Sequence, residues 1–265
     1  MIVLHSGHAR CAIDPVLGGR IASLAVAGRE LLVPGGADAD PMQWGSYPMV
    51  PWAGRIREGR FSHAGRDLAM PQNLGDHAIH GVGFTSAWDI VTPADVTGHT
   101  ATIRLDLGSP WPFGGSSQQH FELSANRVVC DLSVTAGAVA MPAQVGWHPW
   151  FVKPASAQLR LAAMYQRDDA GIPTGELVEP PPGPWDDCFV RPLAPLQLRY
   201  DDLEVTIDSD CDHWVVYDQP LHATCVEPQS GPPDGFTLNP RVLRPGETLA
   251  RRMTISWREI GQALA

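Results

Sequence analysis

The amino-acid sequence predicts an all-β fold, a large antiparallel β-sandwich that forms one domain over residues 1–265. Short runs that alternate apolar and polar residues are broken repeatedly by turn residues, and the chain holds 26 glycines and 25 prolines. No long segment shows the spacing of an amphipathic helix. A chain of 265 residues is long enough to bury a large core, and its length fits one large all-β domain as well as two small ones.

The chain divides into strands and their connections. By apolar alternation and β-branched content, strands are expected at 10–13, 20–26, 31–33, 101–107, 120–124, 128–134 and 159–164. The three strands between 101 and 134 form a meander that serves as scaffold. Residues 34–41 lack periodicity and form a loop, and the Pro- and Gly-rich residues 171–184 form a long surface connection.

Charge and composition limit the possible partners. The net charge of −10, the pI near 5.4 and the lack of a basic stripe argue against a nucleic-acid-binding protein and favour a small or neutral ligand. The first apolar run, residues 1–5, is too short for the central region of a signal peptide, and no later run is long enough to span a bilayer. We therefore expect a soluble, cytoplasmic protein, a monomer or homodimer without a membrane partner.

The cysteines do not indicate a disulfide framework or a thiolate metal site. Their number is odd, they are widely spaced, and no two form a CxxC pair. Each is expected to be a small buried hydrophobic residue. They are Cys11, Cys130, Cys188, Cys211 and Cys225.

A histidine between two tryptophans, in residues 143–151, is the most informative stretch. With the period of a strand, Gly146, His148 and Trp150 share one face, while Trp147 belongs to the opposite, core-like face. An open backbone patch, a titratable ring and a flat aromatic platform are suited to holding a sugar ring against an acid or a base. Alternatively, His148 is a core histidine that hydrogen-bonds neighbouring backbone.

Two further segments carry basic side chains. Residues 47–61 begin irregularly because of two prolines and then turn into a hairpin at Glu58-Gly59, with Arg55 and Arg57 on one face. An arginine offers a fixed fork of donors for ring hydroxyls, although a surface charge is the alternative for either residue. His77 and His80 lie three residues apart and so on opposite faces of a strand, which disfavours zinc ligation and leaves His80 as the better site candidate.

Carboxylates follow in two later segments. Asp186 and Asp187 lie between aromatic residues where a strand begins, and residues 223–226 lead an apolar strand directly into Glu227. A carboxylate there is costly unless it is solvated, paired or used, so Glu227 is either catalytic or part of a rim salt bridge. Pro228 is expected to end the strand and to set the direction of the Glu227 side chain.

In chain order these segments resemble the aldose 1-epimerase (mutarotase) family over most of the length. Each motif is short, but their order is specific. They are Gly18-Gly19-Arg20-Ile21, Ala53-Gly54-Arg55-Ile56, Ile79-His80-Gly81, Gly146-Trp147-His148-Pro149-Trp150-Phe151, Trp185-Asp186-Asp187-Cys188-Phe189 and Val226-Glu227-Pro228-Gln229. The resemblance implies the galactose mutarotase-like supersandwich, with the site in a cleft across one sheet.

The resemblance also implies roles for individual residues. Glu227 matches the general base that acts on the anomeric hydroxyl, and His148 matches the acid that protonates the ring oxygen. Arg55, His80 and Asp186 match residues that bind the sugar. Where many family members have Asn before the arginine and before the second histidine, this chain has Gly54 and Trp147, so altered hydroxyl contacts are expected there. The chain is also shorter than galactose-type members.

The expected activity is therefore that of an isomerase, an aldose 1-epimerase of carbohydrate metabolism that interconverts anomers. Ring opening needs one carboxylate and one imidazole, and no metal, redox group or other cofactor; because the two exchange roles on reclosure, pKa values near neutrality are expected. Three alternatives stay open: a hexose-6-phosphate 1-epimerase using Arg57 and Arg60, a non-catalytic carbohydrate-binding protein on the same fold, and a glycoside hydrolase using Asp186 and Glu227. No GxGxxG, P-loop or GxSxG motif supports a nucleotide-binding protein or a serine hydrolase.

Overall fold

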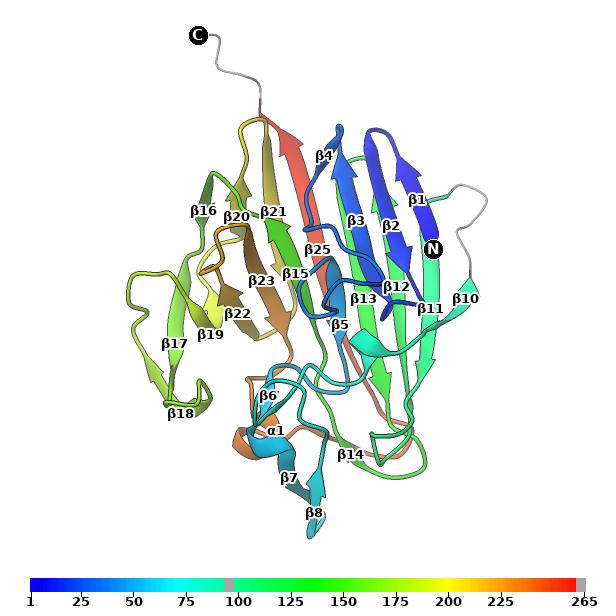
Figure 1. Cartoon of the computed structure of the whole chain (residues 1–265), viewed down its shortest axis with the longest axis vertical. Coiled ribbons are helices and arrows are strands. Elements are labelled where there is room, and N and C mark those ends of the chain that lie inside the picture. The colour runs from blue at the N-terminus through cyan, green and yellow to red at the C-terminus, as the bar shows by residue number, and fades with distance from the viewer. Residues whose placement is uncertain (93–97, 261–265) are drawn as a thin grey trace.

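The computed structural model describes residues 1–92 and 98–260, and it is almost entirely β. Two large sheets pack face to face, so that the strands of one overlie those of the other in Figure 1. The predicted all-β antiparallel sandwich is confirmed. None of the helices in the described ranges is long and apolar enough to cross a lipid bilayer.

The first sheet carries the site. Its 11 strands are, in spatial order, β1 (Ile2–Ser6), β2 (Ala9–Asp14), β3 (Arg20–Val26), β5 (Ser46–Met49), β15 (Gly146–Val152), β23 (Ala223–Gln229), β22 (His213–Tyr217), β19 (Asp186–Pro192), β17 (Leu161–Arg167) and β18 (Pro173–Val178), with β4 (Arg29–Glu30) beside β3. Strands that are distant in the sequence, such as β5, β15 and β23, are therefore neighbours at the centre.

The second sheet is the scaffold. Its 8 strands are, in spatial order, β10 (Asp89–Thr92), β11 (Thr100–Asp106), β12 (Ser116–Ser124), β13 (Arg127–Thr135), β25 (Thr248–Glu259), β21 (Leu203–Ser209), β20 (Leu196–Arg199) and β16 (Ser156–Gln158). The antiparallel run from β11 through β12 to β13 is the predicted meander, and its inward residues alternate with exposed ones.

Short elements extend from one end of the sandwich, at the bottom of Figure 1. They are the pairs β6 (Arg55–Ile56) with β9 (Ala78–Ile79), β7 (Arg60–His63) with β8 (Arg66–Ala69) and β14 (Met141–Pro142) with β24 (Val242–Leu243), the 3-10 turn η1 (Arg57–Gly59) and the four-residue helix α1 (Gly235–Leu238). The 3-10 turn η2 (Gly83–Thr85) packs against β5 instead.

The core fills the space between the two sheets. Trp147 and Phe151 of β15 contribute to it from the first sheet, and Phe121, Leu132 and Ile255 contribute from the second. The five cysteines are all free and buried, as predicted. Because Trp147 and Phe151 face this core, the alternate residues His148 and Trp150 face the outer side of the first sheet.

Two predictions about the segment around Arg57 were wrong. Glu58-Gly59 does not close a hairpin between β6 and β7, because β6 pairs with β9, and Arg57 lies in η1 rather than on a strand face with Arg55. The Asp234 carboxylate accepts the Arg57 backbone N–H at 3.0 Å and holds the chain in this turn.

Two proline-containing segments are more regular than predicted. Pro48 lies within β5, in the segment expected to be irregular, and Pro228 lies within β23, which continues to Gln229 instead of ending at the proline. Residues 171–184 include β18, which pairs with β17. By contrast, the predicted strand at 31–33 is reduced to a bridge between Leu32 and Phe151.

Candidate active site

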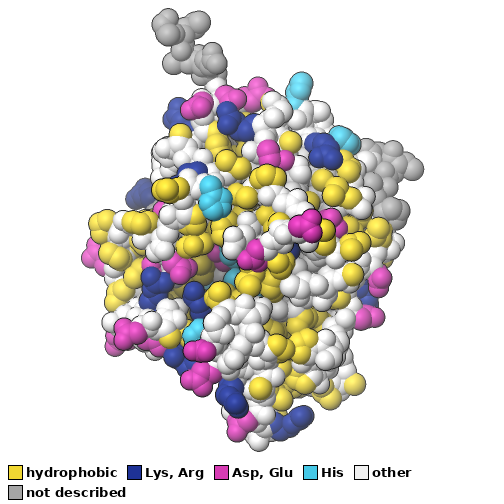
Figure 2. All heavy atoms as spheres, viewed as in Figure 1, with side chains coloured by type: hydrophobic (Ala, Val, Ile, Leu, Met, Phe, Trp, Pro, Cys, Tyr) yellow, Lys and Arg dark blue, Asp and Glu magenta, His cyan; other side chains and the backbone are white. Residues whose placement is uncertain are grey.

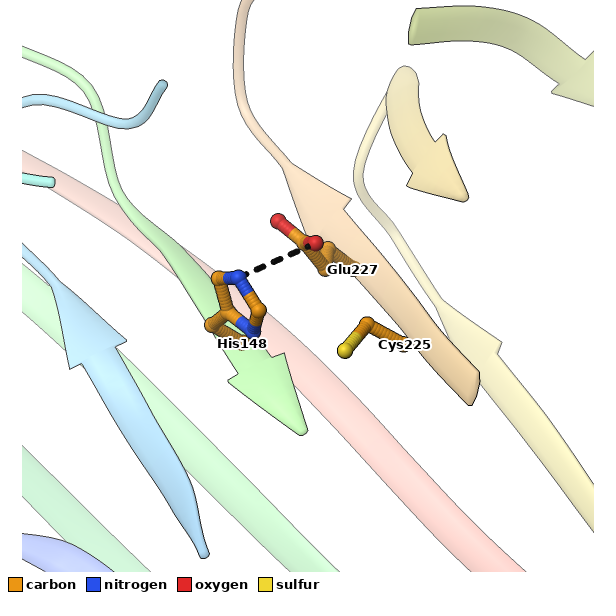
Figure 3. Close-up of side chains that lie close together, drawn as sticks. All are labelled: His148, Cys225 and Glu227. Carbon is orange, nitrogen blue, oxygen red and sulfur yellow. Dashed lines mark ion pairs between the residues drawn. The ribbon is translucent and has the colours of Figure 1, made fainter. Parts of the chain in front are cut away.

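His148 and Glu227 lie on adjacent central strands and face each other. The cross-strand pairs Gly146 with Gln229 and Trp150 with Cys225 bracket them, which places His148 opposite Glu227. The His148 Nε2 atom lies 3.2 Å from a carboxylate oxygen of Glu227, as Figure 3 shows. Their exposed fractions are only 6% and 1%. The structure thus brings together a buried imidazole and a buried carboxylate from positions 79 residues apart.

Two prolines interrupt the backbone ladder at the level of this pair. Pro149 on β15 and Pro228 on β23 have no N–H to donate, and the β15–β23 register has no recorded pair between Gly146–Gln229 and Trp150–Cys225. The ladder is closed at both ends of the interval. We call this interval, from residues 147 to 149 on β15 and 226 to 228 on β23, the proline gap.

Aromatic rings fix the His148 imidazole in place. Tyr47 stacks on one side, with ring centroids 4.7 Å apart and planes 26° apart, and Trp150 stacks at 5.3 Å and 11°. His80 meets the same imidazole edge-on at 5.1 Å. Since stacked and edge-to-face rings resist reorientation, Nε2 stays aimed at Glu227.

His80 is held in a strained backbone conformation that orients its ring. Its φ is +63°, which is uncommon for a residue other than glycine. The Gly54 N–H donates to His80 Nδ1 at 3.3 Å. Burial, with the neighbouring His148 next, lowers the pKa of His80 well below its usual range, so the ring is neutral and Nε2 carries the proton. His80 therefore offers a donor to a ligand.

A network of ion pairs forms one wall of the site. Arg55 lies 3.6 Å from Asp186, and Arg167 lies 3.3 Å from Asp186 and 3.0 Å from Asp187. Arg55 also donates to the Gly171 carbonyl at 3.3 Å. Arg57 pairs instead with Asp168 at 2.6 Å, just behind this wall. The network presents fixed donors and acceptors on the same side of the cavity, as recognition of sugar hydroxyls requires.

These groups line one cavity of about 620 Å³. All six residues singled out from the sequence lie on its surface: Arg55, His80, His148, Trp150, Asp186 and Glu227. Residues that sequence reasoning missed include Tyr47, Gln229 and Arg167. Gln229 could have been found, since it lies two residues after Glu227 and hence on the same strand face, where its amide donates to Glu227 at 3.3 Å.

Burial moves the pKa values of the pair in opposite directions. It lowers the pKa of His148 to about 3, and together with the charge of Asp186 it raises the pKa of Glu227 well above its usual range. Both shifts favour the uncharged pair, a carboxylic acid beside a neutral imidazole. The expectation that both pKa values lie near neutrality is wrong for His148, because the site is more deeply buried than the sequence suggested.

The donor set next to the pair is poorly suited to a metal ion. His148, Cys225 and Glu227 each place one possible ligand atom within 4.8 Å of the others, and Cys225 lies beside the pair in Figure 3. Burial, with Glu227 next, raises the pKa of the Cys225 thiol well above its usual range, so a cation would have to displace a tightly held proton to bind there. His77 faces away from the cavity and accepts the Glu58 backbone N–H at 3.1 Å. The arrangement favours an acid/base pair.

The two departures from the family pattern, Gly54 and Trp147, lie in different parts of the structure. Trp147 is 1% exposed and packs in the core between the sheets, so the expectation that it alters hydroxyl contacts is wrong. Gly54 does line the cavity, with φ at +68°. A Cβ atom there would lie 2.7 Å from the Pro233 side chain, so Pro233 fills the space that a larger residue would need.

The fold and the site together define an all-β protein of the galactose mutarotase-like class, with a buried carboxylate–imidazole pair in a cleft on the outer face of one sheet. The family model described as aldose 1-epimerase matches residues 1–256. The chain belongs to the aldose 1-epimerase family.

The chain is also similar to a curated relative and to solved structures of the same fold. The chain is 32% identical to the uncharacterised protein YphB of Escherichia coli K12 over 136 residues, which span 50% of this chain and 45% of YphB, a little under half of that relative. A galactose mutarotase-like protein from Clostridium acetobutylicum superposes with a TM-score of 0.86 at 17% identity, covering 97% of this chain and 95% of that one. A galactose 1-epimerase from Lactobacillus acidophilus NCFM superposes with a TM-score of 0.80 at 17% identity, covering 97% and 93%.

Proposed function

We propose that this protein is an aldose 1-epimerase that interconverts the α and β anomers of a free aldose. The observation that supports this function best is the buried His148–Glu227 contact of 3.2 Å on the floor of a cavity. A cyclic aldose seated there meets a base for its anomeric hydroxyl and an acid for its ring oxygen at the same time. Arg55, His80 and Asp186 bind its hydroxyls, while Trp150, whose ring stacks on both His148 and His222, lines the cavity.

The protonation states of His148 and Glu227 fit this reaction. In the reactive form Glu227 is a carboxylate and His148 is protonated. Glu227 takes the proton of the anomeric hydroxyl while His148 gives its proton to the ring oxygen, and the C1–O5 bond breaks. The pair ends as a carboxylic acid beside a neutral imidazole, which is the form that burial stabilises. Rotation about C1–C2 and reclosure with exchanged roles then give the other anomer.

The charges around the cavity favour a neutral sugar over a hexose 6-phosphate. Arg55 and Arg167 line the cavity, and both are already engaged by Asp186 and Asp187. Arg57 is paired with Asp168. On the face shown in Figure 2 basic and acidic side chains are interspersed, and a phosphate would have to compete with these carboxylates for the arginines.

The other two alternatives fit less well. A glycoside hydrolase needs a second carboxyl group that donates a proton, whereas Asp186 is occupied by two arginines and is suited to anchoring a hydroxyl. A binding protein has no need to bury a carboxylate against an imidazole, since both lose solvation there. The pair therefore supports a catalytic role.

Anomer exchange followed by polarimetry and by NMR tests the proposal on a panel of free and 6-phosphorylated aldoses. We expect acceleration for one or more free aldoses, and weaker or no acceleration for their 6-phosphates. Equal rates with and without protein across the panel would refute the epimerase function. Binding of a sugar without any acceleration would instead support a carbohydrate-binding protein.

A further inference from the structure

Arg20, at the start of β3, is a charged residue in an almost fully buried position. Its exposed fraction is 1%. Its guanidinium group donates to three backbone carbonyls from three separate segments, those of Leu17 at 2.6 Å, Trp44 at 3.0 Å and Phe84 at 3.1 Å. Among the described residues no carboxylate forms an ion pair with it; the charges of Asp14 and Asp40 favour its protonated form without direct contact.

A buried charge without an ion-pair partner requires an explanation. Burial lowers the pKa of Arg20 only to about 10, so the side chain stays protonated at neutral pH. Three carbonyls could be satisfied at lower cost by neutral donors, since taking a cation out of water is strongly unfavourable. The three hydrogen bonds explain why a long side chain with several donors lies at this position. They do not explain why that side chain carries a positive charge.

The Arg20 guanidinium packs against a stack of aromatic rings that extends to His148 of the acid/base pair. The guanidinium carbon lies 4.2 Å from the centroid of the Trp44 ring and 5.3 Å from that of Tyr47. Tyr47 in turn stacks on His148 at 4.7 Å, and Trp150 stacks on His148 at 5.3 Å. One aromatic ring, enclosed and shielded from water, thus separates a permanent positive charge from the imidazole.

We propose that Arg20 is a positioning residue for the acid/base pair: its guanidinium holds Tyr47 against His148, and its charge, acting across Tyr47, favours the neutral imidazole with which ring opening ends. This inference rests on the function proposed above. It assigns to the Gly18-Gly19-Arg20 segment a role at the site, although Arg20 contacts neither Glu227 nor His148.

Other charged and titratable groups also face the pair. Tyr47 and His80 contact the His148 ring, Glu227 and Cys225 lie beside it on β23, and Arg55 and Asp186 act on Glu227 from the wall. Burial is the main cause of the low pKa of His148, and the charge of Arg20 acts in the same direction. Removing that charge while leaving the others in place must therefore raise the pKa of His148.

Two substitutions separate the charge from the hydrogen bonds. Arg20→Lys keeps the charge and loses the fork, and Arg20→Gln loses the charge and keeps amide donors. Both are expected to lower the melting temperature. For Arg20→Gln, the acidic limb of the pH profile of kcat/KM is expected to move to higher pH by about 0.5–1 unit, less than the shift from a charge in direct contact. For Arg20→Lys the limb is expected to stay where the wild-type limb lies.

The outcomes are distinct. Equal loss of thermal stability in both variants, with wild-type pH profiles, would make Arg20 purely structural and overturn the inference. If Arg20→Gln does not fold, Trp44→Leu serves instead, because it lets water screen the charge while Arg20 remains; an unmoved acidic limb in that variant would also overturn it. NMR titration of the His148 ring in the wild type and the variant reads the same shift without turnover. A protein that accelerates no anomer exchange but shows this shift would refute the proposed function and retain the role of Arg20.

Discussion

Replacing the Glu227 carboxylate by an amide is the sharpest test of the proposed chemistry. Glu227→Gln preserves the size of the side chain and an acceptor oxygen, but it cannot take a proton from the anomeric hydroxyl. General-base catalysis is worth about 10²–10⁴-fold, which corresponds to about 3–5 kcal/mol of transition-state stabilisation. We expect kcat to fall by that factor, while sugar affinity changes by less than about threefold because the wall residues are untouched.

The same substitution has an expected effect on stability. Burial raises the pKa of Glu227, so the folded protein holds this proton more tightly than the unfolded chain does. The resulting stabilisation is complete below the unfolded pKa and is lost as the pH rises through the folded pKa. Gln cannot ionise, so the Glu227→Gln variant does not lose stability in this way as the pH rises. The variant should therefore unfold at the same or a higher temperature than the wild type at neutral pH, with an advantage that grows with pH.

Polarimetric exchange assays, sugar titrations and thermal melts on one preparation measure these effects together. Glu122→Gln is the matched control, since Glu122 is an exposed strand residue of the second sheet and its replacement should leave rate and stability unchanged. A Glu227→Gln protein that is folded and retains wild-type exchange would refute the assignment of the base. A variant that is inactive because it is unfolded would refute the argument that a buried carboxylate costs stability.

Three further outcomes follow from the site. Burial lowers the pKa of His148 to about 3 and raises the pKa of Glu227. We therefore expect kcat/KM to fall on the acidic side only near pH 3, and to fall on the alkaline side as Glu227 ionises. An acidic limb near pH 6.5, measured after correction for spontaneous exchange, would contradict the lowered pKa of His148. Arg55→Lys should raise KM by about tenfold with kcat within threefold in saturation kinetics, since a point charge replaces a fixed fork, and a loss confined to kcat would contradict a binding role. Activity should be unchanged after dialysis against a chelator, and stoichiometric zinc by elemental analysis together with loss of activity would contradict a metal-free mechanism.

The fold was predictable where each residue's local pattern agrees with its tertiary position. The strands around Ile103, Phe121 and Leu132 alternate inward and outward residues, so their pairing could be anticipated. Prolines misled the prediction, because Pro48 and Pro228 both lie within central strands, where proline is uncommon. The course of the chain through Arg57 depends on the Asp234 carboxylate, 177 residues away, which no local rule reveals.

The site was predictable to the extent that strand period decides which face a side chain takes. His148 was predicted to share a strand face with Gly146 and Trp150, and Glu227 to follow an apolar strand; both side chains line the same cavity. Tyr47 and Arg20 were missed for different reasons. Tyr47 lies in a segment that its prolines made look irregular, and Arg20 belongs to a residue type that is almost never fully buried.

The proline gap is a local opening in the first sheet at the level of the acid/base pair. On one side lie β1 to β15, and on the other β23 to β18. Because strand pairs close the ladder on both sides of the gap, at Gly146 with Gln229 and at Trp150 with Cys225, β15 and β23 stay fixed relative to each other. The paired ends thus act as a rigid frame that sets the spacing of imidazole and carboxylate, and a sugar ring has to fit that spacing rather than change it.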